Sequence, residues 1–373
     1  MKKITIGVVT LFVVLAVLLQ LRSVQALLID WYLPDFPRWP QPVAALTETT
    51  VDGEIYYATA SPFDLDVIFG GMAHATPTTG LGYLSIPAVA SAEQPVPAMV
   101  ILPGSGGIAP GREREYAKLL NAHGIAAFVV EYDLPRGMTP DLPYMVRTSA
   151  VTEFDVITDA YAALTLLSTS PRIDPRRIGL MGFSYGGMVA RFAMDDRFRQ
   201  VLAKDSAGFA LHVDFYGPCF QNLQTAATNL APLLTLRGSA DRSNDLTACA
   251  ARERELAALG VRVDAEVFPG AGHAWENATP RHTSESPYIS GCEIRYDAQG
   301  FSWLNGERIA NVATDAGRGE RIAARLTSGG KYDGCLYYGY TVGRDEVATQ
   351  RGYAELLRFL KRHFHLELDV AGP

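Results

Sequence analysis

The chain of 373 residues lacks the sequence marks of several functional classes. It has no block of Lys and Arg and its net charge is −7, which argues against a nucleic-acid partner. It has no G-x-G-x-x-G fingerprint and no phosphate-binding loop, so we expect no nucleotide cofactor. It has no C-x-x-C pair and no Cys/His spacing typical of zinc, so we expect no metal. No internal repeat or low-complexity segment is visible.

What is present is ordinary globular composition. The chain is 48% hydrophobic and 20% charged, which gives ample material for a large core. Length alone suggests two domains, but α/β enzymes of this size are often one domain with insertions.

The first residues are typical of an export signal. Met1-Lys2-Lys3 is positively charged, the stretch from Ile4 to Leu21 is apolar, and Val24-Gln25-Ala26 offers small residues to a signal peptidase. The apolar stretch is close to the ~20 residues of a spanning helix. Residues 1–26 are therefore either a cleaved signal peptide, which we favour, or a retained anchor that is the protein's one contact with a membrane. In both cases the body is exported, periplasmic or secreted.

Cysteine usage agrees with an exported protein. The four cysteines lie outside the leader, and an even number in such a chain predicts two disulfides with three connectivities open. We favour pairing between sequence neighbours, which gives Cys219–Cys249 and Cys292–Cys335.

Apolar runs and amphipathic stretches alternate along the middle of the chain. The run from Pro97 to Leu102 is continuous, as expected of a strand buried on both faces of a parallel sheet. Alternation of strands and helices predicts an α/β fold with helices on both faces. The predicted strands are 53–58, 82–86, 97–102, 125–132, 177–181, 209–216, 232–237 and 262–268.

Both ends of this pattern are irregular. Residues 27–44 are rich in Pro and Trp and predict an irregular lead-in, while residues 276–342 are polar and Gly-rich with little periodicity. A clear amphipathic pattern returns only in the final helix. We therefore expect one domain over 27–373, with 276–342 as an insertion near the functional site that could act as a lid.

The most informative stretch is Gly182-Phe183-Ser184-Tyr185-Gly186-Gly187. It follows a predicted strand and opens a predicted helix, and strand, G-x-S-x-G, helix is the nucleophile elbow of the α/β-hydrolases. The tight turn strains the serine backbone and lifts its hydroxyl clear of the sheet, while the helix N-terminus favours developing negative charge. Ser184 is the predicted nucleophile.

A serine hydroxyl needs a base, and the base needs an acid that fixes its tautomer. In this fold the order is Ser, Asp or Glu, then His, in loops after successive strands. Asp241 and His273 each follow a predicted strand directly, where open α/β sheets place their sites. Asp245 competes with Asp241, whereas the other histidines lie in helices, inside a strand, before the catalytic strands or in the insertion.

Acyl transfer also needs donors for an oxyanion. One is expected to be the backbone N–H of Tyr185, the residue after the nucleophile. The other should come from the Gly-rich loop after strand 97–102, where Ser105 is the first choice and Gly106 its rival. Tyr144, Trp275 and Trp303 could line a substrate pocket, or could simply pack.

These stretches together resemble the dienelactone hydrolase family. The similarity covers residues 50–275 and the last helix, and rests on 100–107, 172–187, 237–241 and 270–273. It implies an α/β-hydrolase fold and hydrolysis of small-molecule esters, with Ser184, Asp241 and His273 at the triad positions. The chain differs from the founding enzymes of the family, which use a cysteine nucleophile. It also differs from them in its export signal and its insertion. A serine carboxylesterase fits these departures.

Two other functions are compatible with the motifs. A serine peptidase of the prolyl oligopeptidase type shares the elbow and the triad order, but the residues between the leader and the first strands leave no room for its usual propeller. A non-catalytic binding protein of the α/β-hydrolase fold is the second. The complete Ser, Asp and His set argues against it.

Overall fold

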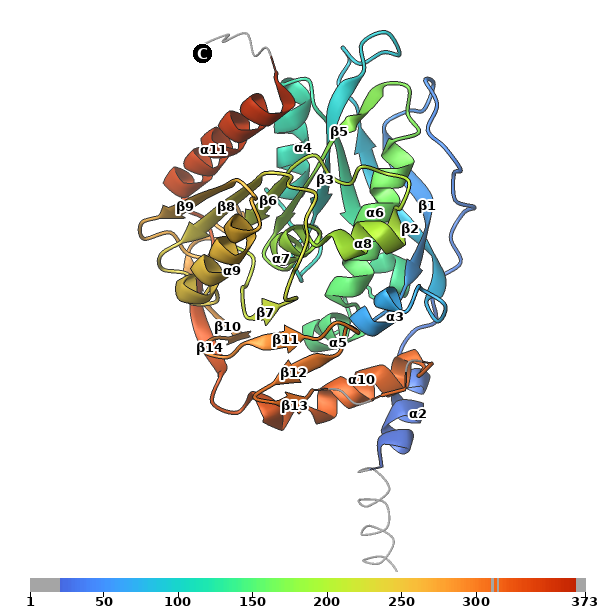
Figure 1. Cartoon of the computed structure of the whole chain (residues 1–373), viewed down its shortest axis with the longest axis vertical. Coiled ribbons are helices and arrows are strands. Elements are labelled where there is room, and N and C mark those ends of the chain that lie inside the picture. The colour runs from blue at the N-terminus through green and yellow to red at the C-terminus, as the bar shows by residue number, and fades with distance from the viewer. Residues whose placement is uncertain (1–20, 310–311, 314, 367–373) are drawn as a thin grey trace, which may run out of the picture.

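The chain is built around an eight-stranded, mostly parallel sheet (Figure 1). A computed structural model describes residues 21–309, 312–313 and 315–366. The strand order is β1-β2-β4-β3-β5-β6-β8-β9, with β2 antiparallel to both of its neighbours and every other pair parallel. The strands are β1 (Gly53–Ser61), β2 (Thr76–Ser85), β3 (Val96–Leu102), β4 (Ala126–Glu131), β5 (Ile173–Phe183), β6 (His212–Phe215), β8 (Leu233–Gly238) and β9 (Val263–Phe268). This arrangement confirms the predicted fold class.

Helices cover both faces of the sheet. Every residue of β3 is buried, and its side chains alternate between two cores. Val100 and Leu102 belong to the core under α6 and α7, whereas Met99 and Ile101 belong to the core under α4 and α11. The helices are α4 (Glu113–Ala122), α6 (Glu153–Leu167), α7 (Tyr185–Phe192), α9 (Leu246–Ala258) and α11 (Glu346–Phe364). Shorter ones are α3 (Leu65–Phe69), η1 (Leu134–Arg136), α5 (Tyr144–Ala150) and α8 (Asp196–Leu202).

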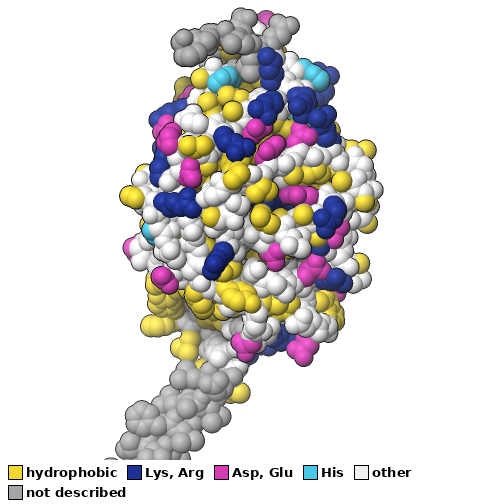
Figure 2. Space-filling model, turned by 90° about the vertical axis from the view of Figure 1, so that its left-hand side faces the viewer, with side chains coloured by type: hydrophobic (Ala, Val, Ile, Leu, Met, Phe, Trp, Pro, Cys, Tyr) yellow, Lys and Arg dark blue, Asp and Glu magenta, His cyan; other side chains and the backbone are white. Residues whose placement is uncertain are grey.

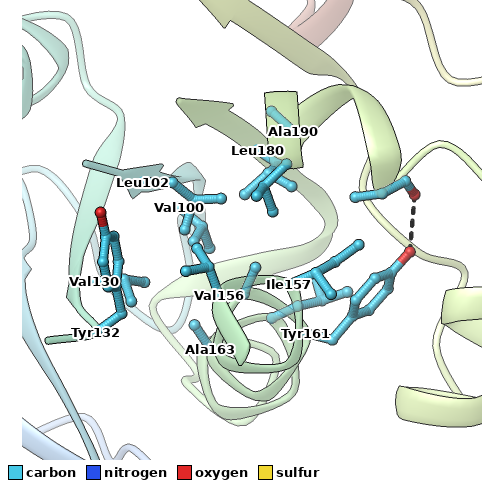
Figure 3. Close-up of a cluster of buried hydrophobic side chains, with 14 of the residues drawn as sticks. Val100, Leu102, Val130, Tyr132, Val156, Ile157, Tyr161, Ala163, Leu180 and Ala190 are labelled. Atoms are coloured by element: carbon cyan, nitrogen blue, oxygen red, sulfur yellow. Dashed lines mark hydrogen bonds between the residues drawn. The ribbon is translucent and has the colours of Figure 1, made fainter. Parts of the chain in front are cut away.

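Helix α6 shows how local sequence sets an element boundary. The Thr152 hydroxyl accepts from the Asp155 N–H, and the Asp155 carboxylate accepts from the Thr152 N–H, which is a capping box. Apolar residues at steps of three and four then face the sheet. Figure 3 shows Val156 and Ile157 beneath the β3 and β5 side chains, and the Tyr161 hydroxyl donating to the Ala193 carbonyl at 2.9 Å.

Residues 276–342 form a layer of their own, which we call the insertion layer. Figure 1 shows it in orange along the lower end of the molecule. A two-stranded antiparallel sheet pairs β10 with β14, and a second sheet has the order β13-β12-β11-β7. Because β7 belongs to the main domain, this sheet ties the layer to the body. The bounds are β7 (Gln221–Asn222), β10 (His282–Ile289), β11 (Ile294–Tyr296), β12 (Ser302–Leu304), β13 (Glu307–Arg308), α10 (Arg318–Thr327), η2 (Gly329–Tyr332) and β14 (Leu336–Val342).

The prediction of an irregular lead-in over 27–44 is wrong at its start. Helix α2 (Arg22–Tyr32) runs into this segment and lies beside α10 in Figure 1. The contact is close, since a Cβ on Gly319 would lie 2.7 Å from the Ala26 carbonyl oxygen. The prolines that suggested irregularity begin only at Pro34, after the helix has ended.

The four cysteines form Cys219–Cys249 and Cys292–Cys335, the pairing that we favour from the sequence. Disulfides of this kind are typical of proteins outside the cytoplasm. None of the helices within residues 21–309, 312–313 and 315–366 is long and apolar enough to cross a membrane. The apolar part of the predicted leader, up to residue 20, lies outside the described residues.

Candidate active site

Ser184 stands at the sharp turn between β5 and α7. Its φ and ψ are 54° and −115°, a backbone conformation that a non-glycine residue rarely adopts. The turn needs small neighbours, because a Cβ on Gly182 would lie 2.1 Å from the Gly186 carbonyl. A Cβ on Gly186 would lie 2.4 Å from the Leu102 carbonyl oxygen. The two glycines therefore allow the helix to approach β3, and the half-exposed serine is presented at the helix N-terminus.

The structure brings the three predicted side chains together. Ser184 Oγ lies 2.8 Å from His273 Nε2, and His273 Nδ1 lies 2.7 Å from Asp241 Oδ2. Asp241 follows β8 and His273 follows β9, so neighbouring strands deliver both loops to the carboxyl edge of the sheet. Asp245, the rival of Asp241, instead caps α9 by accepting from the N–H groups of Thr247 and Ala248.

Asp241 is buried and fully hydrogen-bonded. The Ser243 hydroxyl donates to Oδ1 at 2.5 Å, and the Asn244 amide donates to Oδ2 at 2.7 Å. Burial alone would raise the pKa of Asp241, but the charge of His273 and the bonds from His273, Ser243 and Asn244 hold it below its ordinary value. The carboxylate is thus kept ionised beside the imidazole.

The loop of His273 is held by the last strand of the insertion layer. The His273 N–H donates to the Thr341 carbonyl at 2.7 Å, and the Gly343 N–H donates to the His273 carbonyl at 3.1 Å. The Tyr340 ring also packs edge-on against the imidazole, with ring centroids 5.5 Å apart. These contacts could not be predicted from the sequence, because β14 lies far along the chain in a segment without clear periodicity.

A buried carboxylate supports the other side of the imidazole. Tyr216 packs against His273 with ring centroids 4.8 Å apart, and its hydroxyl donates to Glu276 Oε2 at 2.7 Å. Tyr116 donates to Oε1 of the same group at 3.0 Å. Burial raises the pKa of Glu276, although both hydroxyls bond its carboxylate. Glu276 therefore holds Tyr216 in place behind the histidine.

The Gly-rich loop after β3 lies beside the serine, as predicted. A Cβ on Gly104 would lie 3.4 Å from the Ser184 Cβ. The Tyr132 hydroxyl donates to the Gly104 carbonyl, and the Ser105 and Tyr144 hydroxyls lie 2.7 Å apart. Across the residues that the structure describes, the backbone N–H groups of Ser105 and Gly106 donate to no protein acceptor.

The three aromatic residues suggested as pocket linings have different surroundings. Trp275 is fully buried against Tyr216 and Phe268, so of the two roles considered for it, packing is the one that the structure supports. Tyr144 is partly exposed beside Ser105. Trp303 lies on β12 and donates to Asp297 at 2.8 Å.

A comparison with known protein families assigns the chain to one of them. The sequence model of the dienelactone hydrolase family matches residues 82–303, which is more than half of the chain. The chain belongs to the dienelactone hydrolase family. The predicted resemblance is thereby confirmed, and this dienelactone hydrolase family member is a carboxylic ester hydrolase for small-molecule substrates. No curated protein matched the chain.

Solved structures similar to this family member include two further proteins. A Klebsiella pneumoniae subsp. pneumoniae MGH 78578 protein assigned to the dienelactone hydrolases is 19% identical, with 60% of this chain and 88% of that chain covered and a TM-score of 0.42. Esterase 2 of the planctomycete Thermogutta terrifontis with propionate bound is 17% identical, covers 53% and 80% of the two chains, and has a TM-score of 0.42. Its form phosphonylated by cyclosarin is 18% identical, with 54% and 81% covered and a TM-score of 0.43.

No metal centre is built from the part of the chain that the structure describes. Within it, no three His, Cys, Asp or Glu side chains are placed to hold a metal ion together.

Proposed function

We propose that this enzyme cleaves carboxylic esters through a covalent acyl-enzyme intermediate. Ser184 is the nucleophile, His273 the general base and Asp241 the group that orients the imidazole. The unbroken hydrogen-bonded chain from Ser184 through His273 to Asp241 carries this proposal. An ionised carboxylate can only accept, so the proton of the neutral imidazole is on Nδ1 and the Nε2 lone pair faces the serine hydroxyl.

In the first half of the reaction, Ser184 Oγ forms a bond to the ester carbonyl carbon while its proton passes to His273 Nε2. The C=O electron pair moves onto oxygen and gives a tetrahedral oxyanion. When the C=O bond re-forms, the bond to the alcohol oxygen breaks, and His273 Nε2 gives the proton to the departing alcohol. Asp241 stabilises the transient imidazolium, since its own low pKa keeps it ionised.

The oxyanion is stabilised by backbone N–H groups. Tyr185 begins α7, so its N–H points out of the helix N-terminus where the partial positive charge of the helix also acts. The second donor comes from the loop beside Gly104, where the N–H groups of Ser105 and Gly106 are uncommitted in the described chain. Donors that are fixed in advance need no reorganisation when charge develops.

In the second half, water takes the place of the alcohol. His273 removes a proton from water, the hydroxide attacks the acyl carbon, and the bond to Ser184 Oγ breaks as the serine recovers its proton. The acid is released and the starting tautomer is restored. The leader over residues 1–26 and the two disulfides support a place of action outside the cytoplasm, in the periplasm or as a secreted or N-terminally anchored enzyme.

A fluorophosphonate probe tests the nucleophile directly. The purified enzyme and Ser184→Ala are incubated with the probe, and the turnover of p-nitrophenyl esters of increasing acyl length is followed in parallel. We expect labelling and turnover that both disappear in Ser184→Ala. The two variants are compared by circular dichroism to show that both are folded.

Other outcomes assign the site differently. Labelling without ester turnover, but with cleavage of short peptide substrates, supports a peptidase. A folded wild-type enzyme that neither labels nor turns over any ester contradicts the proposal and favours a binding protein of the same fold.

A further inference from the structure

A row of tyrosine rings leads away from His273 across the insertion layer. Tyr340 packs on the imidazole with centroids 5.5 Å apart, Tyr288 packs on Tyr340 at 5.7 Å, and Tyr337 stacks on Tyr288 at 5.8 Å. We call Tyr340, Tyr288 and Tyr337 the tyrosine row. All three lie on the paired strands β10 and β14.

An irregularity in the pairing of β10 with β14 puts these rings on one face. Residues 337 and 340 are three apart in β14, and in a regular strand they would point to opposite faces. The pairing register shifts between Ser284 and Pro287, and Gly339 opposite has a φ of 86°. This bulge allows Tyr337 and Tyr340 both to contact Tyr288.

The row is open to solvent at its outer end. Tyr337 is 46% exposed, which leaves an aromatic ring in contact with water at this end of the row. Figure 2 shows one side of the molecule, with hydrophobic side chains gathered at its lower end, the end that holds the insertion layer. The surface begins at the imidazole itself, so it is continuous with the reacting groups.

The outermost hydroxyl of the row is already engaged, which leaves the ring surface there to bind a ligand. The Tyr337 hydroxyl donates to the Gly334 carbonyl at 3.1 Å. Ring faces and edges pair preferentially with other aromatic rings, beyond what burial of area alone provides.

We propose that the tyrosine row is the alcohol-side subsite of the enzyme, and that it selects esters whose alcohol carries an aromatic ring. This inference rests on the proposed function, in which His273 protonates the departing alcohol and therefore lies beside it. The family match ends at residue 303, so Tyr337 and Tyr340 lie outside the segment shared with the family. Tyr288 lies inside that segment, so the row combines a residue of the matched segment with two that lie beyond it.

Benzyl acetate and cyclohexylmethyl acetate test the subsite. Both release a primary alcohol with a six-membered ring, but only one ring is aromatic. We expect the isolated enzyme to prefer benzyl acetate in kcat/KM, and we expect Tyr340→Leu to lower this preference about two- to tenfold. Tyr340→Phe should retain it, and Tyr32→Leu, the same change at an exposed tyrosine of α2, should leave it unchanged.

The result separates this inference from the proposed function. Turnover of both esters with no benzyl preference, or a preference unchanged in Tyr340→Leu, overturns the subsite and leaves the esterase intact. Loss of turnover of both esters in Ser184→Ala supports the proposed esterase function and does not depend on the subsite. If Tyr340→Leu fails to fold, Tyr337→Leu at the exposed end of the row gives the same test, with a smaller loss of preference expected.

Discussion

The backbone N–H of His273 donates to the carbonyl oxygen of Thr341 at 2.7 Å. Gly272 permits this approach, since a Cβ there would also lie 2.7 Å from that oxygen. The general base of the proposed triad is therefore placed by the last strand of the insertion layer as well as by β9. We therefore expect the proposed catalysis to depend on folding of the insertion layer, through this bond and the bond from the Gly343 N–H to the His273 carbonyl.

Removal of the disulfide beside β14 should show this coupling. The cysteines of Cys292–Cys335 are 43 residues apart, so Cys292→Ser with Cys335→Ser should lower the free energy of unfolding by about 4 kcal/mol. It should also lower kcat well below the melting transition, because Cys335 directly precedes β14. The control is Cys219→Ser with Cys249→Ser, with a separation of 30, which should cost similar stability with less effect on kcat. An unchanged kcat in the first variant contradicts the coupling.

Asp241 and Asp245 can be separated by matched substitutions. Asp241→Asn should lower kcat about 10⁴-fold, because an amide no longer holds the imidazole in the required tautomer. Asp245→Asn should change neither kcat nor melting temperature appreciably, since Asn caps a helix as well as Asp does. Steady-state kinetics and thermal unfolding of both variants check this. Equal losses of kcat in the two variants would contradict the assignment of Asp241 as the triad carboxylate.

Proline substitutions can distinguish the two candidates for the second oxyanion donor. Ser105→Ala and Gly106→Ala keep the backbone N–H, and a Cβ at Gly106 meets no atom within 4 Å, so both should stay active. Ser105→Pro or Gly106→Pro removes one N–H, and loss of the true donor should lower kcat about 10²–10³-fold. Circular dichroism shows whether each proline variant is folded. If both folded proline variants keep full kcat, this loop supplies no donor.

Asp133 should make stability depend on pH near neutrality. Burial and the nearby Glu131 raise its pKa to about 7, against the opposing charge of Arg147. In the unfolded chain an Asp titrates at about 4. The folded state therefore holds a proton between these values that the unfolded state has lost, so stability falls as the pH rises from about 4 to 7 and then levels off.

Asp133→Asn should not show this decline. Urea unfolding of both proteins at pH 5 and pH 8 checks the prediction, and the wild type should lose stability relative to Asp133→Asn at the higher pH. A constant difference between the two proteins would mean that Asp133 titrates at its ordinary value.

The sequence predicts the fold and the triad for identifiable reasons. Strands such as β3 are continuous apolar runs, and Ser184, Asp241 and His273 lie shortly after the carboxyl ends of β5, β8 and β9. Their relative placement is a consequence of a parallel sheet. The residues that hold them were not predicted. Asn244 bonds Asp241 from a polar turn and Thr341 bonds His273 across the fold, and neither contact leaves a periodic pattern in the sequence.

The insertion layer and α2 were underestimated for a related reason. Most strands of the insertion layer are very short, as in the three residues of β12, and their side chains are largely half-exposed. Strands of two or three residues are too short for an alternation of apolar and polar residues to be recognised. Helix α2 gains its stability from packing on α10, a contact that local sequence near the prolines does not reveal.

The central claim is that an acyl group is transferred to Ser184. The most direct measurement is an acid quench of the enzyme during turnover of p-nitrophenyl acetate, followed by peptide mass spectrometry. The account predicts one added acetyl group on the peptide that contains Ser184, and none in Ser184→Ala. Turnover without any modified Ser184 peptide, or turnover that persists in Ser184→Ala, would contradict it.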